Sequence, residues 1–449
     1  MSPAARRILL SVVVIVVVAL GVGLWIVRGP GPLAFADGPK VALADYRGGN
    51  PTGVPAALTQ TSLVERGAYL ARAADCMACH TTEDGKEYAG GLGFKLPFGT
   101  LYSTNITSDK ETGIGNYTDQ DFLNAMHRGI RRDGARLYPA MPFTSYTYMT
   151  DADALAIKAY LFSLPPVRAA VPENTLTFPF NQRWSMMFWS ALFNPDRRFE
   201  PDASKSPEWN RGAYLAEAMA HCGECHTPRN LAFALDNRKK FAGAVTAGWR
   251  AFNISSDKTT GVGAWRDEDL GSYLSIGHAD GHGTASGPMG EAVDHSLSYL
   301  AQQDIRAVVA YLRTVPATPS PDLPATLAPP APPSHKDGGS TPDPRGKMVF
   351  EGACVSCHGW TGESPISPLA TLTGAWAVND PSATNVAQIV ISGTQRRVPE
   401  GAVSMPAFGS THSDAEIAAV ANYVTARFGS KPSQLTAKDV AELRKQASE

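Results

Sequence analysis

The sequence lacks a clear excess of charge of either sign. Its 449 residues contain 40 Lys and Arg against 42 Asp and Glu, which gives a formal net charge of −2. Proteins that bind nucleic acid normally carry a strong basic excess, so this balance argues against DNA or RNA as a partner. The length is sufficient for about three domains of ordinary size.

No cysteine is left over for a structural disulfide. All six cysteines belong to three Cys-x-x-Cys-His pentapeptides, at residues 76–80, 222–226 and 354–358. The chain also has no fingerprint for PQQ, flavin, NAD or molybdopterin, so it does not name a substrate by itself. Its stability cannot come from cross-links, and its chemistry must be sought in the pentapeptides.

The pentapeptides predict covalent attachment of haem c. Two cysteines three residues apart can each add to one vinyl group of the same porphyrin, and the histidine that follows can ligate the iron. A thioredoxin-like redox pair would not need that histidine, and a zinc site would need paired sets of ligands. We therefore expect three covalently bound haem c groups, attached through Cys76, Cys79, Cys222, Cys225, Cys354 and Cys357, with His80, His226 and His358 as proximal iron ligands.

A methionine follows each pentapeptide in a comparable position. Met141, Met289 and Met405 come 61, 63 and 47 residues after the histidine of their own pentapeptide. A thioether in the sixth position raises the reduction potential and closes the iron to other ligands, so we expect these three methionines to be distal ligands. The alternative is that they only pack a core. Near Met289, the histidines His278, His282 and His295 are further alternatives.

The N-terminus carries a long apolar run. Residues 8–27 contain no charge, which is enough for a helix that crosses a membrane, and Arg6 and Arg7 precede them. The positive-inside bias then leaves the rest of the chain outside, so we expect a cell inner membrane protein with its haem domains on the periplasmic side. The alternative is a cleaved signal peptide, because Ala34-Phe35-Ala36 is an A-x-A-like site.

Internal repeats divide the remainder of the chain. Arg66-Gly67-Ala68-Tyr69-Leu70 and Arg211-Gly212-Ala213-Tyr214-Leu215 precede the first two pentapeptides, and Arg345-Gly346 is a shorter echo before the third. Each should begin a helix whose glycine allows the close approach of an amphipathic helix that closes the domain. The blocks at 105–110 and 253–258 are also duplicated. The first two domains are therefore duplicates, and the third is a more distant relative.

The expected fold is all-α, with three tandem class I cytochrome c domains after an N-terminal transmembrane helix. We call these domains the first, second and third units. The expected bounds are 8–27 for the anchor, 58–165 for the first unit, 166–202 for an aromatic linker, 203–316 for the second unit, 317–340 for a Pro-rich linker, 341–430 for the third unit and 431–449 for a C-terminal tail.

The linker between the first two units is rich in aromatic residues. It contains Phe178, Phe180, Trp184, Phe188 and Trp189, among others. Such a segment could dock a partner subunit, touch the membrane or line a quinone pocket, since a large exposed apolar patch is unusual in a monomer. The alternative is that it covers the cleft between the first two units.

These features resemble a known family, the three-haem cytochrome c subunits of membrane-bound periplasmic dehydrogenases. The resemblance rests on the pentapeptides, the duplicated Asn-Ile-[Thr/Ser]-Ser-Asp blocks, the stretch 137–142, Arg183-Trp184 and the stretch 226–230, and it covers residues 65–428. It implies a partner catalytic subunit of the PQQ, flavin or molybdenum type. It also implies ubiquinone, or a downstream cytochrome or oxidase, as electron acceptor.

Taken together, the residues and the resemblance predict a non-catalytic electron-transfer subunit, because three closed haems leave no open position for chemistry at iron. One alternative is a cytochrome c donor or subunit of a terminal oxidase. Another is a haem enzyme such as a peroxidase, for which the second unit would be the place to look.

Overall fold

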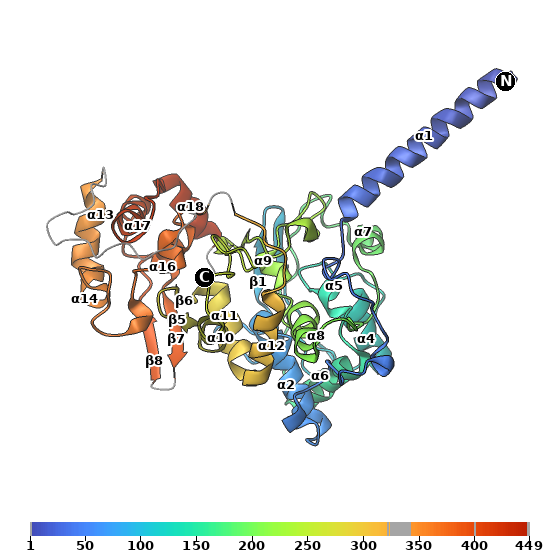
Figure 1. The fold of residues 1–449 in the computed structure, drawn as a ribbon, viewed down its shortest axis with the longest axis horizontal. Helices are drawn as coiled ribbons and strands as arrows, with labels where there is room; N and C mark the ends of the chain where they lie inside the picture. Colours follow the sequence, from blue (N-terminus) through green and yellow to red (C-terminus); the bar gives the residue numbers. More distant parts are fainter. Residues whose placement is uncertain (1, 321–322, 324–342, 399–400, 447–449) are drawn as a thin grey trace.

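The structure is a computed structural model that describes residues 2–320, 323, 343–398 and 401–446. Figure 1 shows the first two units packed together in the middle of the molecule, the third unit at one end, and the helix α1 projecting from the other end. The expected Pro-rich linker at 317–340 falls almost wholly outside the described residues.

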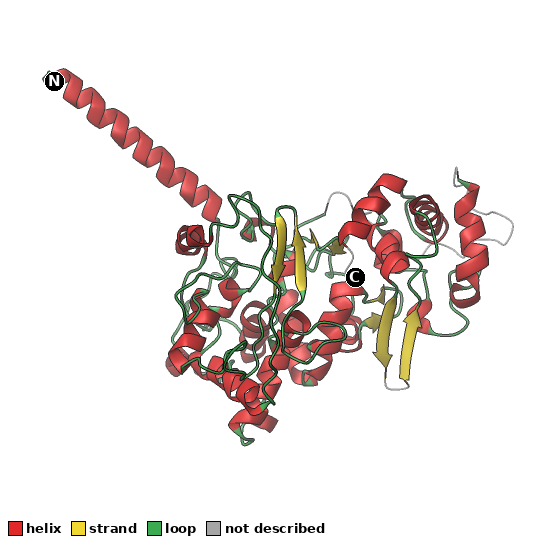
Figure 2. Cartoon of the chain, turned by 180° about the vertical axis from the view of Figure 1, so that it is seen from behind, coloured by secondary structure: helices red, strands yellow, loops and turns green. Residues whose placement is uncertain are grey.

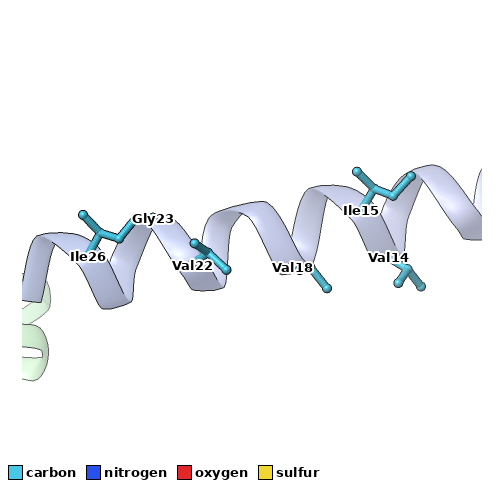
Figure 3. Close-up of a pocket in the computed structure, with 6 residues that line it drawn as sticks. All are labelled: Val14, Ile15, Val18, Val22, Gly23 and Ile26. Carbon is cyan, nitrogen blue, oxygen red and sulfur yellow. The ribbon is translucent and has the colours of Figure 1, made fainter.

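The helix α1 (Pro3–Arg28) is long and apolar enough to cross a membrane. Its most apolar stretch is entirely unburied. Figure 3 shows Val14, Ile15, Val18, Val22 and Ile26 pointing away from the helix axis, along an open apolar face. Such a surface needs lipid around it, or removal as a leader, because water would solvate it poorly.

The first two units share most of their elements in the same order, and the second unit adds a π-helical turn and a further hairpin. In the first unit the elements are α2 (Leu63–Ala73), α3 (Cys76–His80), β1 (Gly93–Leu96), β2 (Gly99–Tyr102), α4 (Asp119–Arg128), α5 (Phe143–Tyr146) and α6 (Asp151–Ser163). In the second they are α8 (Pro207–Tyr214), the π-helical turn η4 (Leu215–Met219), α9 (Gly223–His226), β3 (Ala244–Thr246), β4 (Trp249–Ala251), α10 (Asp267–Ile276), β5 (His278–Ala279), β6 (Gly283–Thr284), α11 (Gly287–His295) and α12 (Gln302–Leu312).

The third unit and the remaining elements complete the described chain. The third unit contains α13 (Pro344–Val349), the π-helical turn η7 (Phe350–Cys354), α14 (Val355–His358), α15 (Trp376–Asn379), α16 (Thr384–Ser392), β7 (Thr394–Val398), β8 (Gly401–Met405) and α17 (Asp414–Phe428), with α18 (Ala437–Gln446) after it. Between the first two units lies α7 (Met186–Phe193), and single 3-10 turns occupy Leu43–Asp45, Ala56–Leu58, Arg183–Ser185, Asn237–Lys239, Leu297–Tyr299 and Pro368–Ala370.

A glycine at each expected position lets two helices cross in close contact. A Cβ atom on Gly67, Gly212 or Gly346 would lie 1.9, 1.8 or 2.2 Å from the carbonyl oxygen of Ala156, Ala307 or Ala419. These contacts pair α2 with α6, α8 with α12 and α13 with α17. The prediction that the repeated glycines allow helix crossing is thereby confirmed, because any side chain at these positions would meet backbone.

The fold is helix-rich, with short antiparallel hairpins that the expected all-α class omits. The pairs are β1–β2, β3–β4, β5–β6 and β7–β8. In the second hairpin the turn residues Ala247 and Gly248 both have positive φ, as a two-residue hairpin turn requires. The residues that form these strands alternate too briefly to stand out in the sequence, so their hairpin structure was missed.

Two hydrophobic cores hold the described residues together. One is shared by the first two units, and the other belongs to the third unit. The segment after α1 contributes to the shared core, since Phe35 packs against Tyr311 with ring centroids 6.0 Å apart and Ala36 is buried. The C-terminal helix α18 packs on α16 and α17 and buries Val440.

Candidate functional site

The pentapeptides lie on short helices that follow the first helix of each unit. They occupy α3, the whole of α9 with the residue before it, and the end of η7 with α14. Cysteines at i and i+3 lie on the same face of such a turn, which suits attachment to one porphyrin. The thiols form no disulfides. Burial raises the pKa of Cys76 and Cys222 to about 12 and of Cys225 and Cys354 to about 11. They therefore lack the lowered pKa of a reactive redox pair.

The three histidines share one hydrogen-bonding arrangement. Nδ1 lies 2.7 Å from Thr104 O in His80, 2.6 Å from Phe252 O in His226 and 2.6 Å from Ala370 O in His358. A carbonyl can only accept, so each Nδ1 carries the proton and donates it, leaving the lone pair of Nε2 for a metal. Burial lowers the pKa of all three imidazoles, which keeps them in the neutral, ligating form. This donor set fits the iron of haem c.

The three candidate methionines occupy different local structures. Met141 lies in the loop before α5, Met289 in the first turn of α11, and Met405 at the end of β8. All three are half-buried. Met141 and Met289 pack against the core that contains Cys76, and Met405 packs against the core of the third unit, as does Cys354. Each methionine therefore shares a core with the pentapeptide of its own unit.

Two of the histidines near Met289 have other partners. His278 has Nδ1 2.9 Å from Thr284 Oγ1 and Nε2 3.1 Å from Asp280 Oδ1. The ring of His282 stacks on Trp265, with centroids 3.7 Å apart. Both side chains are held within the fold by these contacts, which favours Met289 over them as a ligand.

A buried histidine in the first unit leads to a pH prediction. His127 is 2% exposed in α4, and burial, with a further effect of Arg198, lowers its pKa to about 4. In the unfolded chain His127 takes up a proton near pH 6.5, whereas in the folded protein it stays neutral down to about pH 4. The free energy of unfolding should therefore fall by roughly 3 kcal/mol as the pH drops from about 6.5 to about 4. His127→Gln should flatten this slope even if its stability at pH 7 is lower, as urea unfolding at a series of pH values would measure. An unchanged slope would contradict the assignment.

The tyrosine of each Arg-Gly-Ala-Tyr-Leu repeat reaches into the other unit. Tyr69 donates from Oη to Asp304 Oδ2 at 2.6 Å, and Tyr214 donates to Asp153 Oδ2 at 2.5 Å. The tyrosine oxygens also accept from Ala301 N and Thr150 N, at 3.1 and 3.2 Å. Reciprocal hydrogen bonds thus join the first and second units. The repeat was visible in the sequence, but this role of its tyrosine was missed.

These contacts bring the first two pentapeptides together. The helix α3 contacts α11, which carries Met289, and Glu224 accepts from Thr144 and Ser145 beside Met141, both at 3.3 Å. Burial, then the carboxylate of Asp75, then the nearby thiol of Cys225 raise the pKa of Cys79. The first and second pentapeptides therefore face each other across the interface.

A second set of contacts joins the second and third units. The ring of Trp376 meets Phe252 edge-on at 5.4 Å, and Phe252 supplies the carbonyl that accepts from His226. Thr284 donates from Oγ1 to Leu369 O at 2.9 Å, one residue before the Ala370 carbonyl that accepts from His358. The residues that accept the hydrogen bonds of His226 and His358 thus lie in or next to the contacts between the second and third units.

An arginine fixes the same interface. Arg396 is 2% exposed, and its guanidinium donates to Gly290 O at 2.8 Å and Ile276 O at 3.1 Å. It also pairs with Asp294 at 3.1 Å. The third unit was expected to ride on a tether, yet Arg396 and Trp376 seat it directly on the second. Neither residue belongs to a repeat or motif, so no sequence signal pointed to this contact.

A buried ionic network beside the second pentapeptide was also missed. Glu217 and Lys240 are 6% and 5% exposed as side chains and lie 2.7 Å apart, and Tyr311 Oη donates to Glu217 Oε1 at 2.6 Å. Burial is the main cause of the raised pKa of Cys222, but Glu217 raises it further and Lys240 lowers it. Both charges of the pair therefore act on Cys222.

Comparison with known proteins identifies relatives along most of the chain. The sequence family described as "Cytochrome c" matches residues 64–165, and the family "Cytochrome C oxidase, cbb3-type, subunit III" matches residues 342–424. The chain is 38% identical over 414 residues to the fructose dehydrogenase cytochrome subunit of Gluconobacter japonicus, covering 88% of this chain and 85% of that protein.

Two further relatives have the same kind of description. The gluconate 2-dehydrogenase cytochrome c subunit of Pantoea cypripedii is 38% identical over 402 residues, covering 86% of this chain and 90% of that protein. The cytochrome c subunit of the quinone alcohol dehydrogenase of Gluconacetobacter polyoxogenes is 36% identical over 406 residues, covering 86% of each. The match to cytochrome c implies covalently bound haem c. Identity at this level over nearly the whole length shows that the chain belongs to the family of cytochrome c subunits of membrane-bound dehydrogenases.

Proposed function

We propose that this chain passes electrons from the catalytic subunit of a dehydrogenase, through three haem c groups, to ubiquinone or another respiratory carrier. Haem c supplies a one-electron redox centre at each site when bound. The observation that carries the proposal is the shared arrangement of His80, His226 and His358, each with Nδ1–H donated to a carbonyl. The contacts between units support a series, because each adjacent pair of sites is joined by packed groups.

The proposal also assigns the ligands. The six pentapeptide cysteines would hold the porphyrins, and His80, His226 and His358 would be the proximal ligands. Met141, Met289 and Met405 would close the sixth positions, and iron held in this way would exchange electrons without binding substrate. The first, second and third units, at 58–165, 203–316 and 341–430, then each form one class I cytochrome c domain. The three glycine-mediated helix crossings support this division.

The proposed location is the periplasmic face of the inner membrane, with α1 as a retained anchor. The partner is a catalytic subunit of the PQQ, flavin or molybdenum type. Phe35 and Ala36, which form part of the A-x-A-like site, support retention because they pack into the shared core beside Tyr311. Cleavage after Ala36 would remove both residues from that core.

The alternative of a terminal-oxidase subunit has one observation in its favour, the match of residues 342–424 to a cbb3-type oxidase subunit family. That match covers only the third unit. The dehydrogenase cytochrome subunits match 85% or more of the chain, including the first two units and their interface. The dehydrogenase assignment is therefore the better supported.

The purified protein should contain three haem c groups per chain, all low-spin. Haem content against protein mass, measured by the pyridine haemochrome method, gives the count. In the native reduced protein carbon monoxide should bind none of the haems readily, because each iron already has two protein ligands. Ready binding, or turnover of peroxide by the isolated chain, would instead favour a haem enzyme with an open site.

A further inference from the structure

Large apolar side chains are exposed in two segments that lie close together. Phe178, Trp184, Met187 and Phe188 come from the linker and α7, and Leu231 and Phe233 come from the loop after the second pentapeptide. Leu231 is fully exposed. We call these six residues the aromatic surface. Exposed apolar groups gathered in this way indicate a binding surface.

Contacts between the two segments make this surface continuous. Trp189 of α7 donates from Nε1 to Ala232 O at 2.7 Å, which ties the helix to the loop that carries Leu231 and Phe233. Phe98 bridges the two segments, since its ring stacks on Phe180 at 3.9 Å and meets Phe233 edge-on at 5.6 Å. Side chains from the two segments therefore form one patch.

The patch adjoins the end of α1. The helix contacts α7 and leaves the molecule beside it, as Figures 1 and 2 show from opposite sides. Asn230 donates from Nδ2 to Val27 O at 2.9 Å, and Arg238 donates from Nη1 to Ile26 O at 3.1 Å. Carbonyls at a helix C-terminus have no partner within the helix, and a cationic partner is favourable there. The second unit thus holds the end of α1 by two hydrogen bonds, next to the aromatic surface.

We propose that the aromatic surface lies in the headgroup layer of the membrane that α1 crosses, so that the first two units are held flat against the bilayer. The inference rests on the proposed retention of α1. The aromatic surface is continuous with the end of α1, and residues beside the point where a spanning helix leaves the membrane lie at headgroup depth. Lipid is therefore the partner that this surface would contact. Tryptophan is favoured at that depth because its ring is apolar while its N–H is polar. Phenylalanine and leucine supply the apolar contacts of protein segments that lie in the same layer.

Photo-crosslinking in native membranes tests the proposal with the whole complex. The photoreactive amino acid p-benzoylphenylalanine is introduced singly at Phe188 or Leu231, and at Met348 as a matched control. Met348 is 61% exposed against 58% for Phe188, but it lies in α13, at the opposite end of the molecule from α1. After irradiation, the intact mass of the chain reports what was captured.

We expect phospholipid adducts at Phe188 and Leu231, at least about fivefold above the level at Met348. An adduct to another protein at these sites, or no excess of lipid over Met348, would overturn the proposal. A chain that begins after Ala36 would also overturn it, since the same mass shows whether α1 is present. Haem content and reduction by the dehydrogenase, measured on the same samples, reveal separately whether the electron-transfer proposal fails.

Discussion

Gly212→Ala is expected to destabilise the second unit by about 3 kcal/mol. The new Cβ atom would lie 1.8 Å from Ala307 O on the facing helix. That oxygen is backbone, so no side-chain rotation relieves the contact, and α8 and α12 must move apart. Helix propensity alone favours alanine over glycine by about 0.8–1 kcal/mol. A net destabilisation would therefore be due to the close contact between α8 and α12. Urea unfolding of the haem-loaded protein, followed by far-UV circular dichroism and haem absorption, measures the shift in midpoint.

Gly271→Ala is the matched control in the same unit. Gly271 lies in α10, and a Cβ atom there would contact only Cγ2 of Ile305, at an ordinary distance of 3.8 Å. Here the lower entropy of the unfolded chain should stabilise the protein by about 0.5–1 kcal/mol. Opposite signs for the two glycines would confirm that close helix crossing requires Gly212. A similar effect at both positions would show that the crossing tolerates a methyl group.

The helix crossings could be predicted because their signal is local and repeated. An Arg-Gly pair shortly before each pentapeptide, with a closing amphipathic helix later in each unit, indicates one geometry whatever surrounds it. The tyrosine two residues after that glycine in the first two units was equally visible, yet its partner lies in the other unit. Tyr69 is 235 residues from Asp304, and no local pattern connects them. Contacts of this kind follow from how units dock, which the repeat alone does not encode.

Two parts of the second unit differ in local structure from their counterparts in the first. Met141 lies in a loop, whereas Met289 lies in the first turn of α11, where the proline at position 288 is tolerated. Before the second pentapeptide, one residue more separates Tyr214 from Cys222 than Tyr69 from Cys76, and the π-helical turn η4 falls in this stretch. A π turn absorbs a single inserted residue without breaking the helix, so the duplicates keep the same crossing.

The missed network of Glu217, Lys240 and Tyr311 gives the second large prediction. Glu217→Leu is expected to destabilise the protein by about 3–5 kcal/mol, because it leaves the buried ammonium of Lys240 without its partner at 2.7 Å. The hydroxyl of Tyr311 would lose its acceptor as well. Urea unfolding measures the loss. The triple variant Glu217→Leu, Lys240→Met, Tyr311→Phe should recover most of the lost stability. It removes every polar group that the single change leaves buried without a partner.

The same network should shift the reduction potential of the haem proposed at Cys222 and Cys225, and of no other haem. Glu217 and Lys240 both act on Cys222, so they lie within electrostatic range of that attachment site. Glu217→Gln keeps the shape but removes a negative charge and leaves the positive charge of Lys240, which favours the added electron on the iron. Spectroelectrochemical titration should therefore show a raised potential for one haem and unchanged potentials for the others. Equal shifts in all the haems would mean that the network acts through a general loosening of the fold, and no shift would mean that its charges are screened from the iron.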